Sequence, residues 1–141
     1  MSKNFIDLFC GAGGLSLGFE RAGFKCVGAI DISKACINTH KLNFPDCVSI
    51  NTDISKINPR EFSKEIGNKK IDLVIGGPPC PTFSTIGHAK IKSIKGKNNL
   101  NFTLFDDDRN FLFKNYFSYI EHFKPNFFIM ENVQNFITKY Q

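Results

Sequence analysis

The sequence predicts an α/β fold with a doubly wound, mostly parallel sheet. Short apolar runs alternate with helical patterns from the first residues, and glycine, proline or acidic residues separate them. Hydrophobic residues make up 42% of the 141 residues, an ordinary globular composition. Strands that alternate with helices form parallel sheets covered by helices on both faces. The length corresponds to one domain, residues 1–141, large enough to bury a sizeable core.

Five apolar runs are predicted to form the strands of this sheet. Each is short, and each leads into a glycine, an acidic residue or a proline-containing turn. In chain order, the predicted strands are Asn4–Leu8, Phe24–Ile30, Cys47–Ile50, Ile71–Ile75 and Phe127–Met130.

Two helices are predicted between the first three strands. The first has Leu15, Phe19 and Ala22 at helical spacing on one face, and Gly23 ends it. The second runs from a cap at Ser33 to residue 43, before Phe-Pro. We expect its only histidine, residue 40, on the helix surface.

Two more helices are predicted in the second half of the chain. Asn58 and Glu61 flank a proline at the first helical position, which is the pattern of a capping box before a helix over residues 59–66. Acidic residues at 106–108 cap a later helix that reaches residue 123. Its apolar residues recur at helical spacing, namely Leu112, Tyr116, Tyr119 and Phe123.

Cys80 lies on a stiff turn directly after the fourth predicted strand. The turn is Gly-Gly-Pro-Pro-Cys, and two consecutive prolines fix the backbone and direct one side chain. Open α/β sheets bind and react at the carboxyl ends of their strands. Cys80 is therefore predicted to be a nucleophile. The alternative is a small buried apolar residue, the commoner fate of a free cysteine.

Composition limits the other classes of function. The five cysteines are odd in number and include no Cys-x-x-Cys pair, which argues against a disulfide framework, a zinc site and a thioredoxin-type centre. The three histidines have no metal-ligand spacing, so we expect no metal. The net charge of +5 permits contact with a polyanion without demonstrating it. No apolar segment could span a membrane or act as a signal peptide, so we expect a cytoplasmic protein without membrane contact.

A nucleoside pocket is predicted at the ends of the first three strands. Gly11, Gly13 and Gly14 form a turn that lets a ligand approach the backbone closely. Asp31 follows Gly11 by twenty residues, the separation at which an acidic side chain meets ribose hydroxyls. Asp53 is placed to accept a hydrogen bond from an adenine amino group. The alternatives are a tight turn for the glycines, a helix cap for Asp31 and a solvated loop residue for Asp53.

Ser16 indicates which nucleoside cofactor the pocket takes. The dinucleotide fingerprint needs glycine or alanine at this third small position, so a nicotinamide-dependent dehydrogenase is disfavoured. S-adenosylmethionine carries ribose and adenine without a pyrophosphate and tolerates this difference. The predicted cofactor is S-adenosylmethionine.

Taken in order, the motifs resemble the cytosine-5 DNA methyltransferases over almost the whole chain. The family resemblance implies a Rossmann-like S-adenosylmethionine-dependent methyltransferase fold with DNA as the partner. The residues that carry it are Phe9-Cys10-Gly11-Ala12-Gly13-Gly14, Asp31, Asp53, Gly77-Pro78-Pro79-Cys80-Pro81-Thr82-Phe83-Ser84, Arg109-Asn110-Phe111-Leu112 and Glu131-Asn132-Val133.

The resemblance implies a covalent mechanism. Cys80, as a thiolate, would attack carbon 6 of a cytosine flipped out of the duplex, and carbon 5 would become nucleophilic towards a sulfonium methyl group. Glu131 would hold ring nitrogen 3 and the exocyclic amine of the base. The lysine-rich segment after Cys80 would act as a lid on the nucleic acid, the alternative being a mobile solvated loop.

The resemblance also implies which other residues surround the ligands. Ser84 and Asn132 would lie near the reacting base or its supports. For Leu112 and Val133, core packing is the better interpretation of either residue taken alone. The residues implied near the cofactor, in addition to the glycines and the two aspartates, are Phe9, Ile32, Ile54, Pro79, Leu112 and Val133.

Two departures from the family pattern qualify these expectations. Pro81 stands where the family usually has glutamine after the cysteine, and the chain stops at Gln141. We therefore expect the N-terminal part of a catalytic domain, with a sheet incomplete at its C-terminal side. A complementary C-terminal polypeptide would carry the target-recognition region. The alternatives are a non-catalytic cofactor-binding remnant and a tRNA cytosine-5 methyltransferase.

Overall fold

The protein is built around one parallel five-stranded sheet. The structure is a computed structural model that describes residues 3–79 and 112–132. The strand order is β3-β2-β1-β4-β5, and every neighbouring pair is parallel. This confirms the predicted α/β class. The strands are β1 (Asn4–Leu8), β2 (Lys25–Asp31), β3 (Val48–Asn51), β4 (Leu73–Gly76) and β5 (Phe127–Met130).

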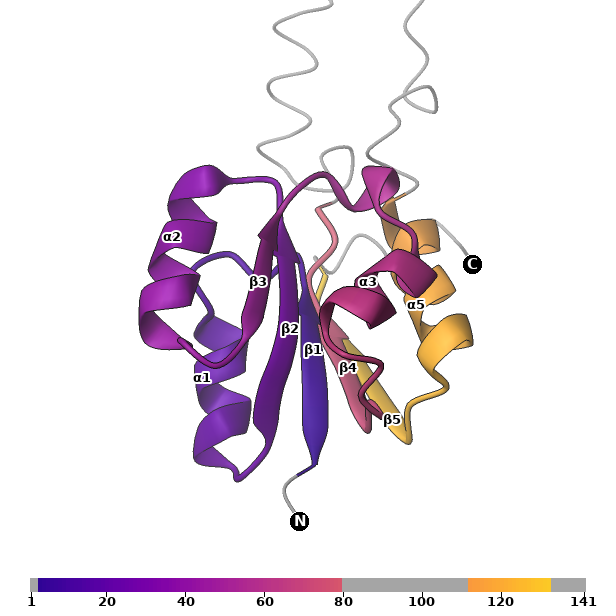
Figure 1. The fold of residues 1–141 in the computed structure, drawn as a ribbon, viewed down its shortest axis with the longest axis horizontal. Helices are drawn as coiled ribbons and strands as arrows, with labels where there is room; N and C mark the ends of the chain where they lie inside the picture. Colours follow the sequence, from indigo (N-terminus) through magenta and orange to yellow (C-terminus); the bar gives the residue numbers. More distant parts are fainter. Residues whose placement is uncertain (1–2, 80–111, 133–141) are drawn as a thin grey trace, which may run out of the picture.

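Helices cover both faces of the sheet (Figure 1). Helices α1 (Gly14–Arg21) and α2 (Lys34–Asn43) lie on one face, and α3 (Pro59–Glu65) and α5 (Leu112–Phe123) lie on the other. The chain first runs outward from β1 to β3 and then returns to β4 on the opposite side of β1. The carboxyl ends of β1 and β4 therefore flank a topological switch point, where open α/β sheets bind their ligands.

Local capping explains where the helices begin. The Ser33 hydroxyl accepts the Cys36 N–H at 3.3 Å. Asn58 and Glu61 form the predicted capping box, with reciprocal bonds of 3.0 and 3.1 Å. Among the described residues, the structure adds one element that was not predicted, the 3₁₀ helix η1 (Ile54–Lys56), which the Asp53 carboxylate caps. This cap fixes Asp53 at the end of β3.

The core consists of two apolar layers, one on each side of the sheet. Successive residues of β1 alternate between them, since Phe5 packs under α1 and α2 while Ile6 and Leu8 pack under α3 and α5. Phe62 is fully buried in the second layer, with ring centroids 5.6 Å from Tyr119 and 6.3 Å from Phe123. These contacts hold α3 and α5 together over the centre of the sheet.

One prediction about a helix face is wrong. His40 was expected on the surface of α2, yet its side chain is completely buried. Both of its ring nitrogens have hydrogen-bond partners on other elements, which compensates for burying a polar ring. On α1, Leu15 is 38% exposed and Ala22 is also exposed, whereas Ser16 is fully buried. The buried Ser16 and the ring of Phe19, which packs against Phe5, together seat this helix on the sheet.

Among the residues described, no helix has the length and apolar character needed to cross a membrane.

Candidate active site

A cavity of about 590 Å³ opens at the carboxyl ends of the strands. Its size is typical of pockets for small molecules, which measure roughly 300–1,000 Å³. It contains seven of the residues for which the sequence predicted contact with a cofactor, namely Phe9, Asp31, Ile32, Asp53, Ile54, Pro79 and Leu112. The predicted Gly11, Gly13 and Gly14 are not among its lining residues. The lining residues that the sequence did not indicate are Ile30, Thr52, Ser55, Gly77, Lys114 and Asn115.

The glycine turn after β1 has a backbone that most residues could not adopt. Gly11 and Gly13 have φ values of 54° and 96°. Phe9 also has a positive φ, 65°, which is strained for a bulky residue, and it lines the cavity. A Cβ atom at Gly11 or Gly14 would meet no other atom within 4 Å. The turn therefore leaves open space beside its backbone, where a ligand can approach.

Asp31 connects the glycine turn to the start of α2. Its Oδ2 accepts the Gly11 N–H and its Oδ1 accepts the Ser33 N–H, both at 2.8 Å. The alternative role of holding the backbone at a helix start is therefore present in the structure. Each carboxylate oxygen has a further lone pair, so Asp31 can still accept a hydroxyl group from the cavity.

Asp53 lies across the cavity at the end of β3. Its Oδ1 accepts the Ser55 N–H at 2.9 Å and the Ser55 hydroxyl at 2.8 Å. These two bonds lower the pKa of Asp53 below its ordinary value, so the side chain is ionised at neutral pH. It remains a hydrogen-bond acceptor for a donor group in the cavity.

The ends of β4 and β5 bring the two predicted reacting motifs side by side. The Glu131 N–H donates to the Gly76 carbonyl at 2.9 Å, and the Asn132 amide donates to the Pro78 carbonyl at 3.2 Å. A Cβ at Gly77 would lie 2.9 Å from Glu131 Oε2, so a larger residue there would displace this carboxylate. The Glu131 side chain thus lies against the turn that leads to residue 80. Cys80, Ser84 and Val133 lie outside the described residues.

Sequence reasoning missed a buried polar chain beneath the glycine turn. Ser16 Oγ donates to Asp7 Oδ2 at 2.6 Å and lies 3.3 Å from His40 Nε2. His40 Nδ1 lies 2.8 Å from Ser49 Oγ. Burial raises the pKa of Asp7 to about 7, although the Ser16 bonds oppose the rise. The signal in the sequence was Ser16 itself, a polar residue where the nucleotide fingerprint has a small apolar one.

The cysteines of the described residues are free thiols. Cys10 lies on the glycine turn, but burial and the nearby Asp7 and Asp31 charges raise its pKa far above the ordinary value. Cys26 and Cys47 lie in the core with their sulfurs 2.8 Å apart, and the pKa of Cys26 is also raised. None of these three suits a thiolate nucleophile. Within the described ranges, no group of histidine, cysteine and acidic residues could hold a metal ion.

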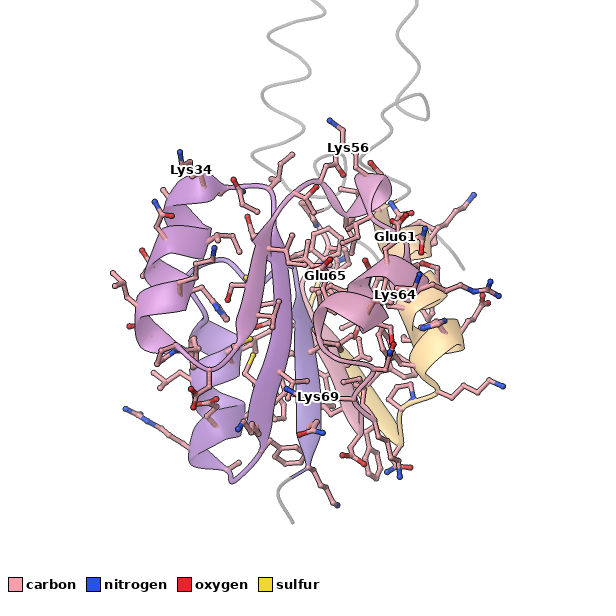
Figure 2. The ribbon with its side chains drawn as sticks, in the orientation of Figure 1. Lys34, Lys56, Glu61, Lys64, Glu65 and Lys69 are labelled. Carbon is pink, nitrogen blue, oxygen red and sulfur yellow. The ribbon has the colours of Figure 1, made fainter. Side chains whose placement is uncertain are left out.

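The charged surface is mixed rather than uniformly basic (Figure 2). Lys34 and Lys56 lie at the strand-end edge of the molecule, where the cavity opens. On α3, Lys64 alternates with Glu61 and Glu65. The described surface therefore gives α3 no single-sign face for a polyanion.

Comparison with known proteins identifies the family. The family model for C-5 cytosine-specific DNA methylase matches residues 3–141. This chain belongs to that family. Among relatives of this DNA methylase chain, the type II methyltransferase M1.HphI of Haemophilus parahaemolyticus is 39% identical over 98% of the chain and 34% of the relative. M.XorII of Xanthomonas oryzae is 41% identical, and the match covers 92% of this chain and 28% of the relative. M.AquIA of Picosynechococcus is 36% identical, and the match covers 97% of this chain and 51% of the relative.

Solved structures agree with the fold of this DNA methylase chain. A structure described as a DNA modification methyltransferase of an E. coli prophage superposes with a TM-score of 0.78 at 37% identity, over 99% of this chain and 35% of that one. Spodoptera frugiperda DNMT2, at 23% identity, has a TM-score of 0.65 over 97% of this chain and 37% of its own, which supports the fold alone. The chain thus spans between 28% and 51% of the length of the named relatives.

Proposed function

We propose that this chain supplies the cofactor pocket and the nucleophile of a DNA cytosine-5 methyltransferase, and that it acts together with a C-terminal polypeptide. The observation that carries the proposal is the position of the cavity beside the paired ends of β4 and β5. A methyl donor in the cavity and a base held by Glu131 would both be within reach of the turn that leads to Cys80.

The residues of the cavity fit S-adenosylmethionine. Asp31 would accept the ribose hydroxyls, and the ionised Asp53 would accept the adenine amino group. Ile32 lines the cavity and is 71% exposed, so an adenine face could cover an apolar side chain that now faces solvent. The open space beside Gly11 and Gly14 leaves room for the amino-acid part of the donor. When bound, S-adenosylmethionine supplies an electrophilic methyl group on a positively charged sulfur.

Cys80 would act by covalent catalysis. The thiolate adds to carbon 6 of the cytosine, and the resulting enamine-like ring makes carbon 5 the nucleophile for the methyl group. Carbon 5 then loses its proton to a base, the carbon–sulfur bond breaks, and the thiolate leaves with the electron pair of that bond. The raised pKa values of Cys10 and Cys26 make these two cysteines poorer candidates for a thiolate.

Glu131 would bind and orient the base from the opposite side. Its backbone is fixed to β4 through the Gly76 carbonyl, and its carboxylate lies against Gly77. Contact with ring nitrogen 3 and the exocyclic amine would favour electron flow into the ring during thiolate addition. The Asn132 amide, bonded to Pro78, would keep the two strand ends at a constant separation.

The edge of the sheet at β5 is the proposed contact with the C-terminal polypeptide. Among the described residues β5 pairs only with β4, and Phe127, Phe128 and Ile129 are 65%, 50% and 43% exposed. Phe117 of α5, which is 37% exposed, lies beside Phe128 with ring centroids 6.1 Å apart. An exposed apolar edge strand with unpaired backbone groups is typical of a surface that another segment covers.

Complementation tests the proposal. The chain is combined with a C-terminal methyltransferase segment that carries a target-recognition region, and transfer of tritiated methyl groups to DNA is measured. We expect activity from the mixture and none after Cys80→Ser, with Cys36→Ser as a matched control that remains active. Substrates containing 5-fluorocytosine in DNA or in tRNA should trap a Cys80 adduct with DNA only. An adduct with tRNA instead would favour the tRNA methyltransferase, and a mixture without transfer would favour a non-catalytic remnant.

The β5 contact has its own test. Phe128→Lys places a charge on the proposed interface, whereas Leu42→Lys changes an 83% exposed apolar residue on α2, far from that edge. We expect the first variant to weaken association with the C-terminal polypeptide and the second to leave it unchanged, as measured by pull-down at equal concentrations. Equal association of both variants would contradict the assignment of β5.

A further inference from the structure

The polar residues buried under α1 and α2 form one continuous chain of contacts. Asp7, Ser16, His40 and Ser49 are each at most 6% exposed. They come from β1, α1, α2 and β3 respectively, and consecutive members are separated by 2.6, 3.3 and 2.8 Å. We call this set the polar chain. It connects the two helices to each other and to two strands of the sheet.

The donors and acceptors of the polar chain determine its direction. The single hydroxyl hydrogen of Ser16 is donated to Asp7 Oδ2, which leaves Ser16 Oγ as an acceptor. His40 Nε2–H can then donate to Ser16 Oγ, and the Ser49 hydroxyl can donate to His40 Nδ1. Removing the Ser16 hydroxyl takes a hydrogen-bond partner from two buried atoms, Asp7 Oδ2 and His40 Nε2, which is the costly way to lose a hydrogen bond.

The polar chain supports the glycine turn from below. A Cβ at Gly13 would overlap the Phe44 ring and lie 2.9 Å from His40 Cδ2. The His40 and Phe44 rings are in contact, tilted by 38° with centroids 4.5 Å apart, so together they form the surface on which Gly13 rests. Ser16 lies in the first turn of α1, three residues after that glycine. The depth at which the turn lies on the sheet thus depends on His40 and Ser16.

We propose that Ser16 and His40 are positioning residues for the methyl donor, because the polar chain fixes the glycine turn at the height at which its backbone meets the ligand. Neither side chain lines the cavity, so the effect is transmitted through the turn. The inference rests on the proposed function, since it takes the turn to be part of the cofactor site. Ser16 replaces the glycine or alanine of the dinucleotide fingerprint, and the polar chain gives this serine a structural role.

Two readouts on the same variants test the proposal. Amide hydrogen exchange of residues 11–17 reports the turn without any ligand, and equilibrium dialysis with tritiated S-adenosylmethionine reports the cofactor site. We expect Ser16→Ala to accelerate exchange and to raise the dissociation constant, each by roughly tenfold, because two buried partners lose their bonds. Ile66→Val, a buried substitution in the apolar layer on the opposite face of the sheet, should leave both readouts unchanged.

A matched pair of His40 variants separates positioning from simple packing. A glutamine amide nitrogen takes the place of Nε2 and can still donate to Ser16, whereas an asparagine amide nitrogen takes the place of Nδ1 and cannot. Both variants lose the ring contact with Phe44. We expect His40→Gln to stay within about threefold of the wild-type dissociation constant and His40→Asn to lose roughly tenfold.

Equal losses for His40→Gln and His40→Asn, or an unchanged turn in Ser16→Ala, would overturn the proposal. Failure of the proposed function would appear differently, as a folded wild-type chain that binds no S-adenosylmethionine while Ser16→Ala still accelerates exchange in the turn.

Discussion

Asp7 is expected to make the stability of this chain fall as the pH rises. Its carboxyl group is 1% exposed, and burial raises its pKa from 3.8 to about 7. The bonds from Ser16 oppose this rise, and the negative charge of Asp31 adds to it. Among the described residues, Asp7 Oδ1 is buried without a hydrogen-bond partner, so the ionised form is poorly compensated. The folded chain therefore favours the protonated carboxyl group.

The size of the effect follows from the two pKa values. Between pH 3.8 and about 7, the folded chain keeps a proton that the unfolded chain has released. The free energy of unfolding therefore falls with rising pH, at up to about 1.4 kcal/mol per pH unit, and levels off above the folded-state pKa. Over the whole range from pH 3.8 to about 7, the free energy of unfolding decreases by about 4 kcal/mol. About 2 kcal/mol of this decrease occurs between pH 5.5 and pH 8.

Urea unfolding of the wild type and of Asp7→Asn measures the contribution of Asp7 to the pH dependence of stability. Far-ultraviolet circular dichroism follows unfolding at pH 5.5, 6.5, 7.5 and 8.5, and the difference in free energy between the two proteins removes the contribution of other titrating groups. Asparagine can still accept from Ser16 but cannot ionise. We expect the variant to gain about 2 kcal/mol relative to the wild type across this range. Parallel stability curves would refute the reasoning.

Three further predictions concern stability, each measured by urea unfolding. Gly13→Ala should lower the free energy of unfolding by about 1–3 kcal/mol, because its Cβ would overlap the Phe44 ring and the backbone φ is 96°. Gly18 is exposed and has open space beside it, so Gly18→Ala should raise the free energy of unfolding by about 0.5–1 kcal/mol. Asn58→Ala removes the capping box of α3 and should lower the free energy of unfolding by about 1 kcal/mol. An unchanged midpoint of urea unfolding would contradict the role of Asn58 as a cap. Tyr116→Phe should cost about 1 kcal/mol, because the buried hydroxyl bonds to carbonyls of β4 and β5 at 3.0 and 2.8 Å; a fully stable variant would contradict the bridge.

The order of strands and helices could be predicted because its signals are local. The Asn58 and Glu61 capping box and the Ser33 cap both depend on residues three positions apart, and the structure has both. The twenty-residue separation between Gly11 and Asp31 correctly placed both residues at neighbouring strand ends. Helix ends within the described residues differ from prediction by about a residue, as is usual at frayed termini, whereas the predicted cap at residues 106–108 lies outside them.

The polar chain could not be predicted, because its contacts join residues that are distant in the sequence. His40 does lie at helical spacing with the buried Ile37 and Phe44, so its position in an apolar stripe was a usable signal. Its partners Ser16 and Ser49 belong to a different helix and to a strand, and only the tertiary fold brings them to its ring nitrogens. The two hydrogen bonds explain why a histidine is stable there.

A crystal structure of the chain with bound S-adenosylhomocysteine would be decisive for the cavity. We expect the adenosyl group inside it, with ribose hydroxyls about 3 Å from the Asp31 carboxylate and the adenine amino group near Asp53. A nucleoside bound at another surface, or an empty cavity at saturating ligand concentration, would contradict the assignment of the strand-end cavity as the cofactor site.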